Sequence, residues 1–242
     1  MTLNDIYHAI DPVALSLGPL QIRWYGLAYV AGFICAFLVI AKLSQRWKIR
    51  IDDDAFFTVV FCVIFGVILG GRLGYVLVYG DGYYLQHPEK ILAFNEGGMS
   101  FHGGLVGVVI GGVIAAKITK IPFLTLADMG VVGVPIGLFF GRCANFINGE
   151  LWGAPTDMPW GVVFGGAAGT MPRHPSQLYE ALLEGVVLFI ILFALSRKTP
   201  ARPRGTFFGT FLLFYGLFRF TIEFIRQPDS SCPARRAATV CA

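Results

Sequence analysis

Long apolar stretches alternate with short polar ones along this chain, and about six of them are candidates for membrane spans. A helix needs about 20 predominantly apolar residues to cross the hydrocarbon core of a bilayer. The ranges that the pattern predicts are 20–41, 55–79, 100–116, 124–146, 177–195 and 205–225. The third range is shorter than a full crossing and begins among glycines, so we expect a broken or re-entrant helix there.

The composition agrees with a polytopic membrane protein. The chain has 242 residues, of which 55% are hydrophobic and only 14% are charged. Soluble domains have about 45–50% apolar and about 25% charged residues. We therefore predict an all-α fold, a polytopic transmembrane helix bundle with a glycine-rich broken segment and an external loop region.

The distribution of Lys and Arg predicts the orientation in the membrane, because cytoplasmic loops carry an excess of positive charge. The loops after the first, third and fifth spans are basic, whereas the opposite loops carry only Lys90 and Arg173. The N-terminus and the segments 79–98 and 148–176 are therefore expected outside, and the basic loops in the cytoplasm.

One side of the fourth predicted span is made of small residues. Gly133, Gly137 and Gly141 recur every four residues and therefore lie on one helix face. Small residues let transmembrane helices approach closely, so we predict a helix-packing surface here.

The end of the fourth span brings together an arginine, an amide and a carboxylate. Arg142 and Asn145 are three residues apart, and Glu150 follows the helix end. Ionisable groups within a bilayer persist mainly when they are paired or functional. Two interpretations remain open: an internal salt bridge, or an anion site in which the guanidinium binds a phosphate.

The sixth span carries a polar stripe. Tyr215, Arg219 and Glu223 follow one another at intervals of four residues and share one helix face. Arg219 and Glu223 could simply pair with each other. The alternative is that Arg219 is a second arginine for the same anion.

A single histidine, His102, lies among four glycines at the start of the third span. It is either structural or a group that takes a proton from a thiol or hydroxyl. Tyr25 could belong to an interfacial aromatic belt or to the site. Two further sets are predicted to be mainly structural and to line one polar cavity. They are Arg72 with Tyr75 and Tyr79, and Glu180 with Glu184.

The usual signatures of cofactor and metal chemistry are missing from the sequence. There is no Walker loop, no dinucleotide glycine fingerprint, no HExxH, no GxSxG and no CxxC pair. No charge block is long enough for a nucleic-acid arm. We expect no cofactor, no metal ion and no nucleic acid, and a chemistry based on arginine, histidine, tyrosine and carboxylate.

Several motifs in register resemble the prolipoprotein diacylglyceryl transferase family, over roughly residues 11–229. They are the runs 96–105 (EGGMSFHGGL), 141–153 (GRCANFINGELWG), 173–180 (RHPSQLYE), Tyr215-Gly216-x-x-Arg219 and 226–229 (RQPD). Ala144 stands where the family signature usually has glycine.

The resemblance implies transfer of the diacylglyceryl group of phosphatidylglycerol to the lipobox cysteine thiol of a preprolipoprotein. This is the first step of bacterial lipoprotein maturation, and it uses no metal or nucleotide. The location would be the bacterial inner membrane, with several spans and an external N-terminus. We expect a monomer.

The resemblance also suggests roles for the residues named above. Catalytic roles fall on His102, Arg142, Arg219, Tyr215 and Glu150. Phosphatidylglycerol would be bound by Arg142, Asn145, Glu150, Arg219, Tyr25 and Gly153. His102 would help the thiol to ionise, and the two arginines would stabilise the departing phosphate.

The family normally has a seventh span, and this chain does not continue in that way. We predict one transmembrane catalytic domain over 1–229 and an atypical polar tail over 230–242, the mark of a truncation or frameshift. The alternatives to an active enzyme are an inactive truncated paralogue and a lipid-binding or transport membrane protein.

Overall fold

The computed structural model describes residues 2–17, 20–49, 51–80, 82–93, 98–197 and 203–227. These residues are mostly helical and form two compact units, which we describe separately. The first unit comprises residues 1–42, 131–201 and 207–242, and the second comprises 43–130 and 202–206. The predicted tail 230–242 lies outside the described residues.

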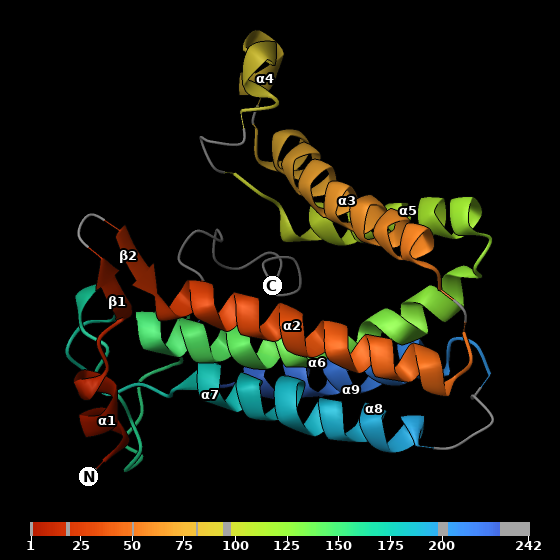
Figure 1. The fold of residues 1–242 in the computed structure, drawn as a ribbon. Coiled ribbons are helices and arrows are strands. Elements are labelled where there is room, and N and C mark those ends of the chain that lie inside the picture. Colours follow the sequence, from red (N-terminus) through yellow and green to blue (C-terminus); the bar gives the residue numbers. More distant parts are fainter. Residues whose placement is uncertain are drawn as a thin grey trace. The chain divides into compact units, whose positions relative to one another are not determined.

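The first unit contains a bundle of long apolar helices (Figure 1). Its members are α2 (Trp24–Arg46), α6 (Phe123–Asn148), α7 (Ser176–Glu180), η4 (Ala181–Val187), α8 (Leu188–Ser196) and α9 (Thr206–Glu223). The boundary between the units falls within α2 and α6. Helices α2 and α6 run side by side (Figure 1), and side chains and backbone of the two meet at Gly32 and Gly133.

Glycines bring α2 and α6 together in this unit. A methyl group added at Gly133 would touch Ala36 and Ile40, and one added at Gly32 would touch the backbone of Gly137. The predicted packing face is therefore confirmed at two of its glycines. Gly141, the third, has no such neighbour among the described residues.

A π-helical turn joins α7 to α8. The π segment η4 covers Ala181–Val187, and the three elements run without interruption from Ser176 to Ser196. Gly185 in this turn faces Phe139 of α6, where an added Cβ would lie 2.9 Å from the Phe139 Cα. Such wide turns frequently occur at functional sites. Here the turn begins directly after Glu180.

A folded cap covers the end of the first unit where α6 terminates. It contains α1 (Leu3–Ala9), the antiparallel hairpin of β1 (Val13–Leu17) and β2 (Leu20–Arg23), and η3 (Gly166–Ala168). Its core is a cluster of Phe146, Val162, Phe164 and Ala168, against which Tyr7 packs. The loop over 148–176 is therefore part of a packed structure. The hairpin also replaces the first residues of the span that we had begun at Leu20.

The second unit is built around the pair α3 (Asp53–Tyr79) and α5 (Phe101–Thr119). The two helices have the most extensive contact of any pair of elements. Their facing surfaces are lined by Gly66, Gly70, Gly74, Gly103, Gly107 and Gly111. Without side chains at these positions the two backbones touch, which is the close approach that small residues permit in membranes.

Arg72 of α3 organises the segment that leads into α5. Its side chain is 1% exposed. The guanidinium donates hydrogen bonds to the carbonyl oxygens of Ile91 (2.8 Å), Lys90 (2.7 Å) and Gly98 (3.2 Å). The short helix α4 (Tyr83–Gln86) precedes these residues, and Lys90 is the last residue of the short helix η1 (Pro88–Lys90). The structural role predicted for Arg72 agrees with this arrangement.

Helix α5 begins at Ser100, whose hydroxyl accepts from the Gly103 amide at 3.2 Å. It then runs unbroken to Thr119. The break that we expected in this segment is therefore absent from 101–119, and the left-handed backbone lies before the helix, at Gly98.

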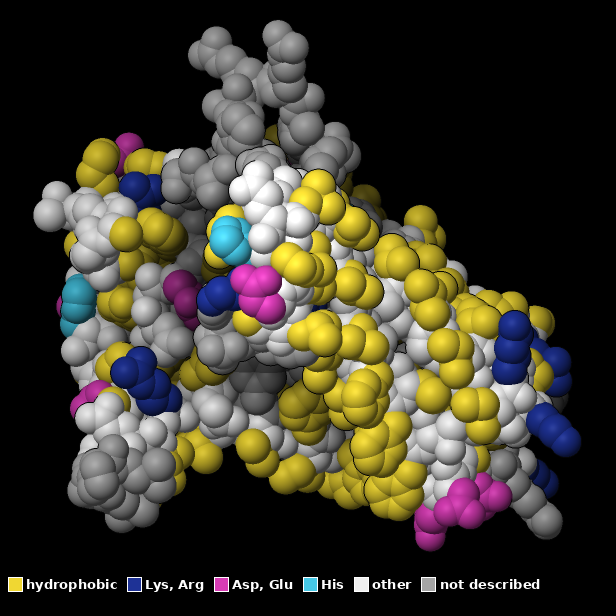
Figure 2. Space-filling model, turned by 90° about the horizontal axis from the view of Figure 1, so that it is seen from above, with side chains coloured by type: hydrophobic (Ala, Val, Ile, Leu, Met, Phe, Trp, Pro, Cys, Tyr) yellow, Lys and Arg dark blue, Asp and Glu magenta, His cyan; other side chains and the backbone are white. Residues whose placement is uncertain are grey.

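Five helical stretches are long and apolar enough to cross a membrane, by length and composition, within the described part of the chain. They are Trp24–Arg46, Asp53–Tyr79, Phe101–Thr119, Phe123–Asn148 and Ser176–Ser196. Each matches a predicted span to within a few residues. The sixth predicted span corresponds to α9, which contains Arg219 and Glu223 and is not among the five. Hydrophobic side chains cover long stretches of the surface in view (Figure 2).

The α3–α5 interface leads to a prediction about stability. A Gly107→Ala methyl group would overlap the carbonyl oxygen of Gly66, so the two helices must separate. We expect a loss of about 1–3 kcal/mol, the range for overpacking, measured as a lower thermal unfolding midpoint in detergent.

Gly104→Ala is the matched control. It lies on the same helix, and its added methyl group would meet no atom closer than 3.7 Å. Because alanine has a higher helix propensity than glycine, this variant should have an unchanged or slightly higher unfolding midpoint. Equal midpoints for the two variants would show that the glycine contact does not stabilise the pair.

Candidate functional site

Two arginines from different helices meet on one carboxylate in the first unit. The Glu180 Oε2 atom lies 2.6 Å from Arg142 Nη2 and 3.4 Å from Arg219 Nη1. Glu180 ends α7, Arg142 is in the last turns of α6, and Arg219 is in α9. The predicted meeting of Arg142 and Arg219 is thus present within this unit, through a residue that we had assigned to the structural set.

Glu184 lies beside this group, one turn further along. Its Oε2 atom is 4.0 Å from Arg142 Nη2, and both Glu180 and Glu184 are fully buried. Both oxygens of Glu184, the Oε1 atom of Glu180 and the Nε of Arg142 have no hydrogen-bond partner among the described residues. Unpaired buried polar atoms are rare in folded proteins and mark a place of unusual chemistry. We call Arg142, Glu180, Glu184 and Arg219 the arginine–carboxylate cluster.

Arg219 has a second carboxylate partner on its own helix. Glu223 Oε2 lies 3.2 Å from Arg219 Nη2, so the pairing considered from the sequence is present. Glu223 is 47% exposed, whereas the side chains of Arg142 and Arg219 are 17% and 15% exposed. Tyr215 of the same stripe stacks on Phe211, with ring centroids 5.5 Å apart.

Glu150 belongs to a separate hydrogen-bonded turn after α6. Its Oε1 atom accepts from Asn145 Nδ2 at 2.8 Å and from Asn148 Nδ2 at 3.4 Å. The internal salt bridge considered for Arg142 therefore uses Glu180 and Glu184, and the asparagines hold Glu150. Leu151 in this turn has a φ of 58°, a left-handed conformation that costs energy for a residue with a branched side chain.

The start of α7 fixes this turn to the arginine–carboxylate cluster. Gln177 Nε2 donates to the Glu150 carbonyl oxygen at 2.6 Å, and Ser176 Oγ donates to that of Leu151 at 3.0 Å. Ser176 and Gln177 are fully buried. Because Glu180 lies one turn further along the helix, one short segment positions both the turn and the arginines.

Gly153 occupies a place where no side chain fits. It bridges Arg226, and its amide donates to the His174 carbonyl oxygen at 2.9 Å. An added Cβ would lie 2.8 Å from the His174 Cβ and carbonyl oxygen, and 2.9 Å from the Ile225 carbonyl oxygen. Gly153 therefore joins the loop over 148–176 to the residues that follow α9.

Arg173 makes the same connection with its side chain. It donates to the Gln227 Oε1 atom, which follows α9, at 3.3 Å, and to the carbonyl oxygens of Ala168 (2.8 Å) and Gly153 (3.3 Å) within the loop. Its guanidinium lies over the Trp152 ring at 5.6 Å. A further donor, Trp160 Nε1, binds the hydroxyl of Tyr179 at 2.6 Å. The resulting framework holds the loop against α7.

His102 and Tyr25 belong to elements other than those that carry the arginine–carboxylate cluster. His102 is in the first turn of α5, in the second unit, in edge contact with the Phe101 ring. Tyr25 is the second residue of α2, in the first unit. A role for His102 beside the arginines stays a prediction.

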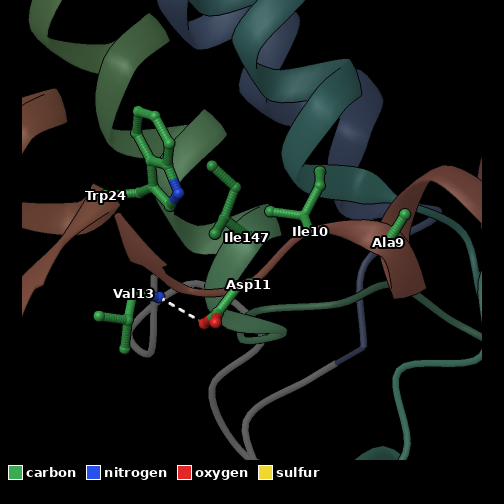
Figure 3. Close-up of a pocket in the computed structure, with 6 residues that line it drawn as sticks. All are labelled: Ala9, Ile10, Asp11, Val13, Trp24 and Ile147. Atoms are coloured by element: carbon green, nitrogen blue, oxygen red, sulfur yellow. Dashed lines mark hydrogen bonds between the residues drawn. The ribbon is translucent and has the colours of Figure 1, made fainter. Parts of the chain in front are cut away.

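A pocket of about 480 Å³ lies near the end of α6 (Figure 3). It is lined by Ala9, Ile10, Asp11, Val13, Trp24 and Ile147. Its one carboxylate, Asp11, accepts from the Val13 amide at 2.8 Å. The lining is otherwise apolar and includes none of the arginine–carboxylate cluster.

Metal chemistry finds no support in the described residues, where no group of three or more His, Cys, Asp and Glu side chains could hold an ion. The charges instead form an arginine pair backed by buried carboxylates. This arrangement suits the binding of an anion such as a phosphate.

The fold and cluster define a polytopic helical membrane protein with a candidate anion site within its helix bundle. The family model for prolipoprotein diacylglyceryl transferase matches residues 12–242. The chain belongs to this family.

Three curated relatives carry the name phosphatidylglycerol–prolipoprotein diacylglyceryl transferase. The protein of Geobacter sulfurreducens is 54% identical over 91% of this chain and 84% of its own length. That of Cupriavidus metallidurans is 51% identical, covering 93% and 84%, and that of Desulfotalea psychrophila is 50% identical, covering 91% and 82%.

Sequence reasoning did not find the contacts between helices. Glu180 and Glu184 were placed on one face, but their partner Arg142 is about 40 residues away in the chain. The sequence signal for these contacts was the presence of two carboxylates, one turn apart, within an apolar span. Burying them is costly, so a cation is needed nearby.

The packing at Gly153 gives a prediction for the loop over 148–176. Gly153→Ala should push the loop away from His174 and Ile225, because its methyl group has no space. We expect faster cleavage of the loop by protease in detergent and a lower unfolding midpoint. Gly209→Ala, whose methyl group would meet nothing within 4 Å, should resemble the unaltered protein. Equal cleavage rates would contradict the tight fit.

Proposed function

We propose that this protein transfers the diacylglyceryl group of phosphatidylglycerol to the lipobox cysteine thiol of a preprolipoprotein. The relatives named for this reaction cover more than nine-tenths of the chain. The observation that carries the proposal is the shared contact of Arg142 and Arg219 with one Glu180 oxygen. It brings two cations to within reach of a single phosphate.

In this reaction the thiol sulfur forms a bond to the lipid glycerol carbon, and that carbon loses its bond to the phosphate oxygen. The products are a thioether and glycerol phosphate, and the thiol proton must be accepted. Arg142 and Arg219 would hold the phosphate and stabilise the charge that develops on the departing oxygen. Both keep a small exposed edge, through which a lipid head group could reach them.

His102 is the proposed proton acceptor for the thiol, whose pKa is ordinarily about 8.5. Histidine is suited to this task at neutral pH. The proposal requires the first turn of α5 to face the arginine pair in the working enzyme.

The remaining predicted residues would orient the substrate. Glu150, held through its Oε1 atom by Asn145, would bind hydroxyl groups of the head group with its other carboxylate oxygen. Tyr25 and Tyr215 would donate further hydrogen bonds, and Gly153 would keep the loop beside the lipid. No cofactor takes part in this scheme.

The activity is tested by measuring transfer from phosphatidylglycerol to a lipobox peptide in detergent. Arg142→Ala and Arg219→Ala should each lower kcat/KM at least about 100-fold, because charge-assisted hydrogen bonds to the phosphate are lost. His102→Ala should lower it by about 100-fold or more, the value of a general base.

Arg204→Ala, an exposed arginine before α9, should retain full transfer. Wild-type rates in all three site variants would discard the scheme. Absence of transfer by the unaltered chain, together with retained lipid binding, would favour an inactive relative or a lipid-binding protein.

We further propose the bacterial inner membrane as the location, an external N-terminus and a monomer. The basic loops support the orientation. Alkaline phosphatase, which is active only outside, should be inactive when fused after Ile49 and active when fused after His87. The opposite pattern would invert the orientation.

A further inference from the structure

Glu180 lies on the buried side of the arginine pair. It is fully buried, whereas the side chains of Arg142 and Arg219 keep 17% and 15% of their surface exposed. An anion that approaches the exposed edges therefore meets two guanidinium groups whose inner sides are already bound to a carboxylate.

The same carboxylate also determines how far apart the two cations are. Both guanidinium groups bind one oxygen atom, so their separation is limited by two contacts of 2.6 and 3.4 Å. Removal of this charge would leave Glu184, 4.0 Å from Arg142, and Glu223, 3.2 Å from Arg219, as the remaining carboxylate partners, so the two cations would repel each other more strongly. Glu180 therefore positions the pair and partly neutralises it.

The partial neutralisation matters for the product. The substrate phosphodiester carries one negative charge, whereas a phosphate monoester carries nearly two at neutral pH. An arginine pair without a counter-charge would therefore bind the product more tightly than the substrate. The carboxylate of Glu180 opposes that binding at short range.

We propose that Glu180 is a positioning residue and built-in counter-charge that limits the affinity of Arg142 and Arg219 for phosphate, so that glycerol phosphate can leave. The identity of this product rests on the proposed function. The effect on anion affinity does not, because it follows from the ion pairs alone.

The test measures the binding of glycerol phosphate to the purified full-length protein in detergent by isothermal titration calorimetry. Glu180→Gln should bind it about tenfold more tightly, which corresponds to about 1.4 kcal/mol. In the transfer assay the same variant should have a lower kcat and stronger inhibition by glycerol phosphate. A merely structural role would weaken binding or leave it unchanged, and either result would overturn the proposal.

Two further variants complete the experiment. Ser196→Ala removes a buried hydroxyl of α8 that donates to the Phe193 carbonyl oxygen, and should leave glycerol phosphate affinity unchanged. Glu180→Asp retains the charge, but its shorter side chain holds that charge less close to the two guanidinium groups. We therefore expect it to bind glycerol phosphate about threefold more tightly than the unaltered protein does. If Glu180→Gln does not fold, weaker or unchanged binding by Glu180→Asp overturns the proposal.

Titration with glycerol phosphate requires no turnover. Absence of transfer by the unaltered protein would reject the proposed function. The difference in glycerol phosphate affinity between the unaltered protein and Glu180→Gln would still decide the role of Glu180.

Discussion

The ion pairs of Glu180 with Arg142 and Arg219 are the interaction on which the site depends. Each guanidinium would be expensive to bury alone, and removal of one partner from a buried pair costs about 3–5 kcal/mol. The contacts therefore require α6, α7 and α9 to lie together. The same α7 segment holds the turn that carries Glu150, through Ser176 and Gln177. One charge arrangement thus determines the positions of several groups around the candidate site.

The rest of the fold supplies close backbone packing in place of large apolar side chains. Lipid tails are as apolar as leucine, so burying apolar surface does not by itself drive transmembrane helices together. The glycines between α3 and α5 allow direct backbone contact, and Gly32 of α2 faces the backbone of Gly137 in α6. Arg72 adds hydrogen bonds to the carbonyl oxygens of the segment before α5. The glycine contacts pack one helix backbone against another, and the Arg72 hydrogen bonds satisfy backbone carbonyl oxygens without water.

The membrane helices could be predicted because apolar stretches of nearly fixed length are a strong local signal. The predicted spans agree with α2, α3, α5 and α6 to within a few residues. The hairpin before Trp24 was missed because its second strand, β2, runs directly into α2 with no turn residues between them. The helix at Phe101 is continuous where a break was expected, since Gly103 and Gly107 serve the contact with α3 and cause no bend.

The site was only partly predictable. Arg142, Arg219 and Glu150 stood out because polar groups are rare among apolar residues, but their partners depend on contacts between distant segments. Spacing along α6 suggested Glu150 as the partner of Arg142, whereas the carboxylates come from α7 and η4. The place of His102 beside the arginine pair is still a prediction.

The most direct measurement is an experimental structure of the protein with phosphatidylglycerol bound in a lipid phase. The account predicts that phosphate oxygens lie about 3 Å from both Arg142 and Arg219, with Glu180 on their opposite, buried side. A lipid phosphate bound elsewhere, with the two arginines contacting separate groups, would contradict it.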